Sequence, residues 1–135
     1  MTTSLFAVQE AVYGALMSSA VLQALIGRPA RVYDVVPPSS LFPYVTLGDV
    51  VIKQFDTKDQ TGFEQMLTLH VWSRYRGRKE LKQITQTIYD VLHHAALTVT
   101  GANYVSCQFL AASTAQENDG LTLHGILRYR IVVQH

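Results

Sequence analysis

A run of basic residues is the part of this sequence best suited to binding another molecule. Five cations fall within nine residues, with one aromatic residue among them: Arg74, Tyr75, Arg76, Arg78, Lys79 and Lys82. Cations beside an aromatic ring can contact phosphates and stack on bases, which gives a nucleic-acid interpretation. The alternatives are a solvated rim and a salt-bridge surface that meets an acidic segment of another copy of the chain. The near-neutral total charge favours contact with protein.

An acidic loop is the natural partner for such a surface. Residues 56–62, with the sequence DTKDQTG, have almost nothing apolar to bury, so we expect an exposed and mobile loop. Acid–base catalysis would need a buried carboxyl group, which this composition does not provide. We predict instead that the basic run, this loop and two outward-facing arginines near the end of the chain form interaction surfaces. The predicted residues are Arg74, Tyr75, Arg76, Arg78, Lys79, Asp56, Lys58, Asp59, Arg128 and Arg130.

The remaining reactive side chains do not assemble into a recognisable active site. Cys107 lies in a predicted strand with no glycine-rich elbow after it, which is typical of a buried, inert thiol. His93 and His94 are adjacent on a helix and point about 100° apart, so they lack the same-face spacing that a metal needs. His70 and His124 occupy outward positions of two strands and would approach one another if those strands were neighbours. No phosphate-loop, dinucleotide or zinc motif occurs, so we predict no catalytic residue, cofactor or metal site.

Length and composition indicate one domain, spanning residues 1–135. The chain has 11 Lys plus Arg and 10 Asp plus Glu, so a net charge of +1 gives no general attraction to nucleic acid or membranes. A single cysteine excludes an intramolecular disulfide and suits a reducing cytoplasm. Charged residues make up 16% of the chain, below the roughly 25% of typical domains, and this favours burial of some surface against partners.

The first half of the chain predicts one helix and three extended segments. Leu5, Val8, Val12 and Leu16 repeat at helical spacing, and a break near Ser18 precedes a second short turn that ends at Gly27 and Pro29. Residues 31–33 are β-prone but are soon followed by two prolines, so they form an edge strand or an extended connection. Residues 44–54 form a long strand with a bulge at Gly48, and residues 64–72 form the next.

The second half predicts a helix and a hairpin. The helix runs over residues 78–95, residues 104–111 are β-prone, and residues 118–120 suit a tight turn. The final strand, residues 121–133, alternates apolar and polar side chains. The order α-β-β-β-α-β-β predicts an α+β fold, with a four- to five-stranded, mainly antiparallel or mixed sheet. Both helices would pack on one face, because two helices cannot cover two faces of such a sheet.

Several spaced motifs together resemble a known family. The segment LTLHVWSRYRGRKELKQI, residues 67–84, resembles the central part of the tail-completion family of long-tailed phages and gene transfer agents, whose members are tail-terminator or head-to-tail joining proteins. Other matching pieces follow the same order along the chain: Val32-Tyr33-Asp34 with Pro37, Phe42-Pro43-Tyr44-Val45, Asp119-Gly120-Leu121-Thr122, His124-Gly125 and Arg128-Tyr129-Arg130. The resemblance covers nearly the whole chain, and none of its motifs is a catalytic signature.

The resemblance implies a structural and non-enzymatic role. Members of this family assemble as a ring, typically of six copies, on the head-proximal end of a tail tube. The implied partners are other copies of the chain, the tail tube protein and the head-completion or neck proteins, with DNA passing through the ring without sequence-specific binding. The expected location is the virion tail, after synthesis in the bacterial cytoplasm. The predicted interface residues would then contact another subunit, the tube or the neck. The alternative is a small nucleic-acid-binding module that uses residues 74–82.

Overall fold

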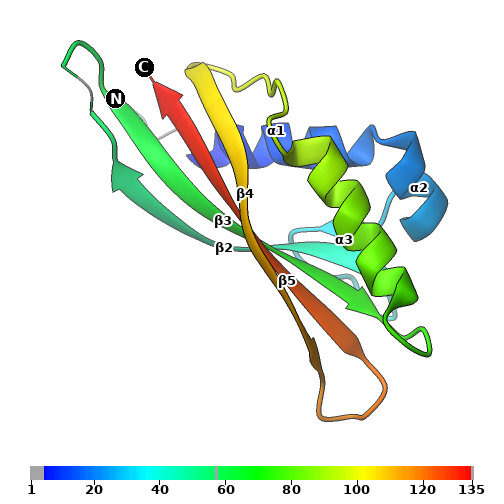
Figure 1. Cartoon of the computed structure of the whole chain (residues 1–135). Coiled ribbons are helices and arrows are strands. Elements are labelled where there is room, and N and C mark those ends of the chain that lie inside the picture. Colours follow the sequence, from blue (N-terminus) through cyan, green and yellow to red (C-terminus); the bar gives the residue numbers. More distant parts are fainter. Residues whose placement is uncertain (1–4, 57, 135) are drawn as a thin grey trace.

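The computed structural model describes residues 5–56 and 58–134, which form one curved sheet and the helices that pack on it (Figure 1). The elements in chain order are α1 (Leu5–Met17), α2 (Ala20–Ile26), β1 (Val32–Tyr33), β2 (Tyr44–Gln54), β3 (Gly62–Ser73), α3 (Lys79–Leu92), β4 (Asn103–Gln116) and β5 (Leu123–Gln134). The predicted α+β fold is confirmed, with one short helix added after the first. Within the described ranges, no helix is both long enough and apolar enough to cross a bilayer.

The sheet is mixed and has the strand order β1-β2-β3-β5-β4. β1 runs parallel to β2, and the other neighbouring pairs are antiparallel. β5 is inserted between β3 and β4, so it pairs with β3 from Gly62 opposite Gln134 to Ser73 opposite Leu123. Buried and less buried side chains alternate along most of both strands, as expected for a sheet that is covered on one face only.

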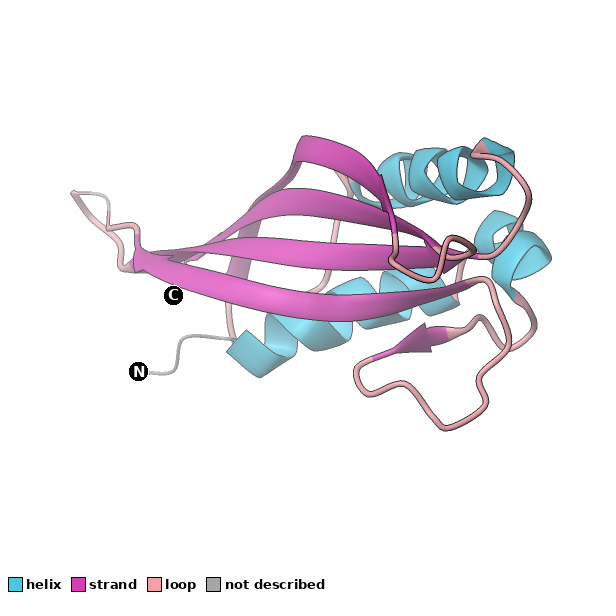
Figure 2. Ribbon diagram, turned by 90° about the horizontal axis from the view of Figure 1, so that it is seen from below, coloured by secondary structure: helices cyan, strands magenta, loops and turns pink. Residues whose placement is uncertain are grey.

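The buried row of the sheet and all three helices share one hydrophobic core. Val12 of α1, Leu22 of α2 and Ile88 of α3 are fully buried, as are Leu69 of β3 and Tyr129 of β5. The helices therefore cover one face, as predicted, and the other face keeps half-buried polar and aromatic side chains. Figure 2 shows that α2 and α3 lie at one end of the sheet, while the loop between β2 and β3 projects from the opposite end.

Gly48 marks an irregularity in β2 that the sequence predicts. The pairing of β2 with β3 shifts between Leu47 and Val50. A Cβ atom on Gly48 would lie 2.6 Å from His70 Nε2 and 2.9 Å from the Thr68 carbonyl oxygen. A side chain at this position would therefore clash with the next strand, and glycine leaves room for the His70 ring beside β2.

The largest differences from the predicted elements are at α2, at the end of α3 and at the end of β4, and β3 begins at Gly62, two residues before the prediction. The expected short turn after Ser18 is a seven-residue helix, α2, in which the Leu22 N–H donates to Ser19 Oγ at 3.2 Å. The second long helix ends at Leu92 and not at residue 95, since His93 is extended and His94 has a φ of 56°. β4 continues to Gln116, five residues beyond the prediction, because it pairs with β5 even where its own side chains are exposed.

Candidate assembly surfaces

The basic turn, residues 74–79, connects β3 to α3 and is exposed throughout. Arg74 is held by its own chain. Its Nε donates to Thr122 Oγ1 at 3.1 Å, and its guanidinium lies 4.2 Å from the centre of the Phe42 ring. Arg76, Arg78 and Lys79 lie further along the turn, where their exposed side chains are available for contact with other molecules. The basic turn therefore divides into one positioned arginine and three exposed cations.

Asp119 anchors the turn between β4 and β5 against the basic turn. Its carboxylate accepts hydrogen bonds from the backbone N–H groups of Thr122 and Leu121, both at 2.8 Å, and from the Thr122 hydroxyl. These donors, the Thr122 N–H first, lower the pKa of Asp119 to about 2. The carboxylate is therefore ionised near neutral pH, and it lies 3.9 Å from the Arg74 guanidinium. The sequence predicted that Leu121 belongs to the final strand. In the structure Leu121 lies in this turn, is exposed, and precedes β5, which begins at Leu123.

The acidic loop, residues 56–62, lies at the other end of β3. Asp56 is turned back onto the loop, since its carboxylate accepts from the Gly62 N–H at 3.2 Å and from the Gln54 side-chain amide. Lys58 and Asp59 are exposed. Thr57 lies outside the described residues, and the mobility of the loop stays a prediction. β3 has 12 residues, and the 11 steps between them, at about 3.3 Å each, place the loop and the basic turn about 36 Å apart. The two can meet only between copies.

The two predicted arginines of β5 have different environments on the open face of the sheet. Arg130 pairs with Glu64 of β3 at 3.0 Å, with side-chain exposures of 26% and 20%. Its guanidinium also lies 5.3 Å from the centre of the Phe55 ring. Arg128 is exposed and stands opposite Thr68 in the sheet. Arg130 is thus satisfied within the chain, whereas Arg128 is presented to the outside.

The structure brings His70 and His124 together, because β3 and β5 are neighbours. His70 Nδ1 and His124 Nε2 are 2.6 Å apart, and His124 Nδ1 lies 2.9 Å from Glu117 Oε1. The Trp72 ring stacks on His124 with a centroid separation of 3.8 Å. Burial and, next, the His124 charge lower the pKa of His70, which favours its neutral form. Sequence reasoning missed Glu117, which reaches this pair from the turn that follows β4.

Catalytic and metal-binding arrangements find little support in this geometry. Among the described residues, no group of three or more His, Cys, Asp or Glu side chains could hold a metal ion. The Cys107 thiol is fully buried, and burial raises its pKa to about 12. A thiol in this environment is protonated near neutral pH and is a poor nucleophile. The predicted place of Cys107 in the core is confirmed.

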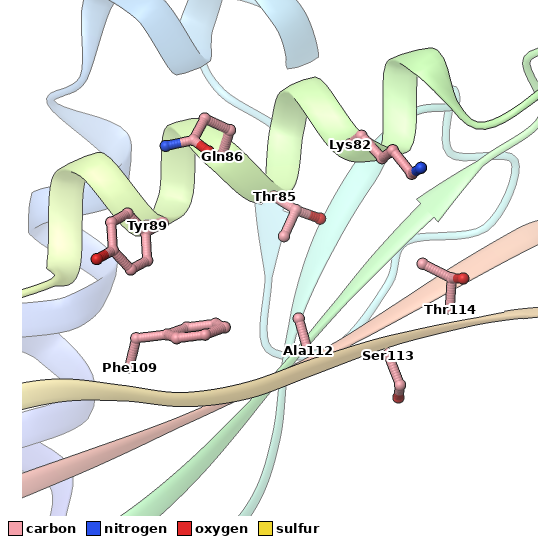
Figure 3. Close-up of a pocket in the computed structure, with 8 residues that line it drawn as sticks. All are labelled: Lys82, Thr85, Gln86, Tyr89, Phe109, Ala112, Ser113 and Thr114. Carbon is pink, nitrogen blue, oxygen red and sulfur yellow. The ribbon is translucent and has the colours of Figure 1, made fainter.

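Two grooves lie at opposite edges of the sheet and were not predicted. The α3–β4 groove has a volume of about 550 Å³ and is lined by Lys82, Thr85, Gln86, Tyr89, Phe109, Ala112, Ser113 and Thr114 (Figure 3). The α1–β1 hollow has a volume of about 540 Å³ and is lined by Phe6, Gln9, Glu10, Tyr13, Val32, Tyr33, Asp34, Val35 and Leu47. No sequence pattern predicts either groove, because both depend on which strands form the edges of the sheet.

Comparison with known proteins identifies relatives of this chain. The family model "Tail completion protein gp17" matches residues 10–134. The chain is 29% identical over 94 residues to the tail completion protein gp17 of Bacillus phage SPP1, covering 70% of this chain and 69% of that protein. It thus shares sequence with a named phage tail protein over most of its length.

Solved structures give the same assignment. A chain in the virion of a native gene transfer agent particle superposes with a TM-score of 0.90 at 29% identity, with full coverage of both chains. The structure of gp17 of bacteriophage SPP1 superposes with a TM-score of 0.64 at 26% identity, covering 93% of this chain and 88% of that one. Sequence and fold agree, and the chain belongs to the tail completion protein gp17 family, whose role is in the assembly of virion tails.

Proposed function

We propose that this protein forms a ring, of six copies, that terminates a tail tube and joins the tail to the head or neck of the particle. The observation that carries the proposal is the match of the entire chain, at a TM-score of 0.90, to a chain of a native gene transfer agent virion. A match over the full length of both chains means that the whole domain, and not a shared fragment, is suited to a place in such a particle.

The two ends of β3 supply the contacts that a joining protein needs. The exposed cations of the basic turn and the charged residues of the acidic loop lie at the two ends of β3, which are about 36 Å apart, from the 11 steps between its 12 residues at about 3.3 Å each. A subunit that presents different charges at its two ends can bind different partners there, the tube at one end and the neck at the other. The exposed side chains that are available for these contacts are Arg76, Arg78, Lys79, Lys58 and Asp59.

The protein acts by shape and does not make or break covalent bonds. Supporting this, the thiol of Cys107 is buried in the core, and the paired histidines on the open face are bonded to each other and to Glu117. The nucleic-acid alternative is weakened by the intramolecular contacts of Arg74, which remove one of its five cations from the available set. Passage of DNA through a ring requires no sequence-specific contact with bases.

Negative-stain imaging of the purified protein with and without isolated tail tubes tests this proposal. We expect ring-shaped density at one end of each tube, and tubes that no longer elongate when tube protein is added. A matched variant, Arg76→Glu with Arg78→Glu, should bind tubes or necks more weakly while keeping its fold. Tubes that stay bare and continue to grow would contradict the proposal, and salt-sensitive binding of duplex DNA by the isolated protein would support the alternative.

A further inference from the structure

β4 is an edge strand without the usual protection against pairing. It occupies the end of the strand order, and its 14 residues, NYVSCQFLAASTAQ, include no charged residue and no proline. Residues 111–116 are all exposed. Edge strands of monomeric proteins normally carry charges or prolines that prevent association with another chain. An uncharged edge of this length is therefore expected to be covered in the assembled state.

The α3–β4 groove beside this edge is apolar with a basic rim. Tyr89 of α3 and Phe109 of β4 meet edge to face, with ring centroids 5.3 Å apart, and Ala112 lies beside them (Figure 3). Lys82 lines the groove towards the start of α3, and Lys79 lies one turn before it on an adjoining hollow. Neither lysine has a carboxylate within salt-bridge distance among the described residues. The groove thus offers an apolar surface and a positive charge to an incoming partner.

The α1–β1 hollow at the opposite edge has complementary properties. Phe6 and Val35 are 68% and 83% exposed, which is unusual for large apolar side chains. The only charged residues that line this hollow, among those the structure describes, are Glu10 and Asp34. β1 pairs with β2 only at Val32 and Tyr33, so most of the outer edge of β2 has no neighbouring strand within the described part of the chain. The hollow is apolar with an acidic rim.

We propose that the α3–β4 groove of one copy binds the exposed residues that line the α1–β1 hollow of the next copy. Phe6 and Val35 would pack against the apolar wall of the groove, and Lys82 would face Glu10 and Asp34. The occupant is a second copy because the two surfaces match in both polarity and charge. Since they differ and lie at opposite edges of the sheet, the contact is heterologous and passes from copy to copy until a ring closes. This inference rests on the proposed ring and names its subunit interface.

Charge reversal across the two surfaces tests the interface. Lys82→Glu and Glu10→Lys each place like charges at every contact, and we expect the protein concentration for half-maximal ring assembly on tail tubes to rise at least tenfold. An equimolar mixture of the two variants should assemble, because alternating copies restore an opposite pair at every contact, and a ring of six accommodates such alternation. Lys53→Glu, an exposed charge that lines neither surface, is the matched control and should assemble normally.

Each outcome distinguishes the interface from the ring itself. Loss of assembly in the single variants with recovery in the mixture supports the interface. Two results would show that the interface is wrong while the proposed function stands, provided that the wild type forms rings. One is that either single variant assembles as well as the wild type, and the other is that the mixture does not recover assembly. If the wild type forms no ring in the presence of tubes, the proposed function fails first. Circular dichroism checks that both variants are folded, as expected for exposed side chains.

Discussion

The two faces of the sheet differ in what their residues do. On the covered face, Leu69, Leu127 and Tyr129 are completely buried and pack against the helices. On the open face, His70, Trp72 and Arg130 are only partly buried and are engaged in stacking, hydrogen bonds and an ion pair. The covered face accounts for stability, and the open face with the two ends and edges of the sheet is left for contact with other molecules. The faces should therefore respond differently to substitution.

The largest effect on stability is expected on the covered face. Leu127→Ala removes a fully buried side chain from the centre of β5 and leaves a cavity. We expect it to lower the free energy of unfolding by about 2–5 kcal/mol. Urea denaturation followed by circular dichroism measures this change. A loss below about 1 kcal/mol would contradict the view that this face holds the fold together.

A smaller loss is expected from Gly48→Ala on the open face. The added methyl group would approach His70 Nε2 and the Thr68 carbonyl oxygen to within 3 Å, so the strands must shift. We expect destabilisation of about 1–3 kcal/mol, as for an overpacked site. Gly14→Ala is the matched control, because nothing lies within 4 Å of a Cβ atom at that position. Equal stability of the two variants in urea would show that His70 does not lie against β2.

These features show how far the sequence determines the fold. The alternation in residues 64–72, the alternation in residues 123–133 of the predicted final strand and the irregularity at Gly48 are local patterns, and each is present in the structure. The approach of His70 to His124 is not local, because it depends on β3 and β5 being neighbours, which the sequence left open. The length of β4 was not predictable, since residues 111–116 are small or polar and exposed on both sides of the strand. The α3–β4 groove was missed for a different reason. It exists because β5 lies between β3 and β4, and strand order is set by packing across the whole chain.

The open face should also make stability sensitive to acid. Burial and His124 lower the pKa of His70 in the folded state, so the unfolded chain takes up a proton first as the pH falls. Neutral His70 contributes its full stabilisation when the pH is above 6.5, the ordinary pKa of histidine. This stabilisation is lost as the pH falls through the lower pKa of His70 in the folded state. We expect the wild type to lose more stability than His70→Gln between about pH 7.5 and about pH 5. His94→Gln is the control, and equal losses in His70→Gln and the wild type would refute this.

The smallest effect on stability is expected at the basic turn. Arg76→Ser with Arg78→Ser removes exposed charges and should change the free energy of unfolding by no more than about 0.5 kcal/mol. The same variant should weaken docking to the tube or neck, measured by co-sedimentation with tails. Arg74→Ser should behave differently, because Arg74 contacts Thr122 and Phe42, and its loss should loosen the turn after β4. If the double variant docks as well as the wild type, the turn has no part in joining.

We propose that this protein ends the tail and connects it to the head. Electron microscopy of particles from a host that lacks the protein tests this role, with tail length and head attachment counted particle by particle. We expect tails of uncontrolled length that are separate from filled heads, with both defects corrected by supplying the wild-type protein. Tails of normal length attached to filled heads in the absence of the protein would show that it has neither role.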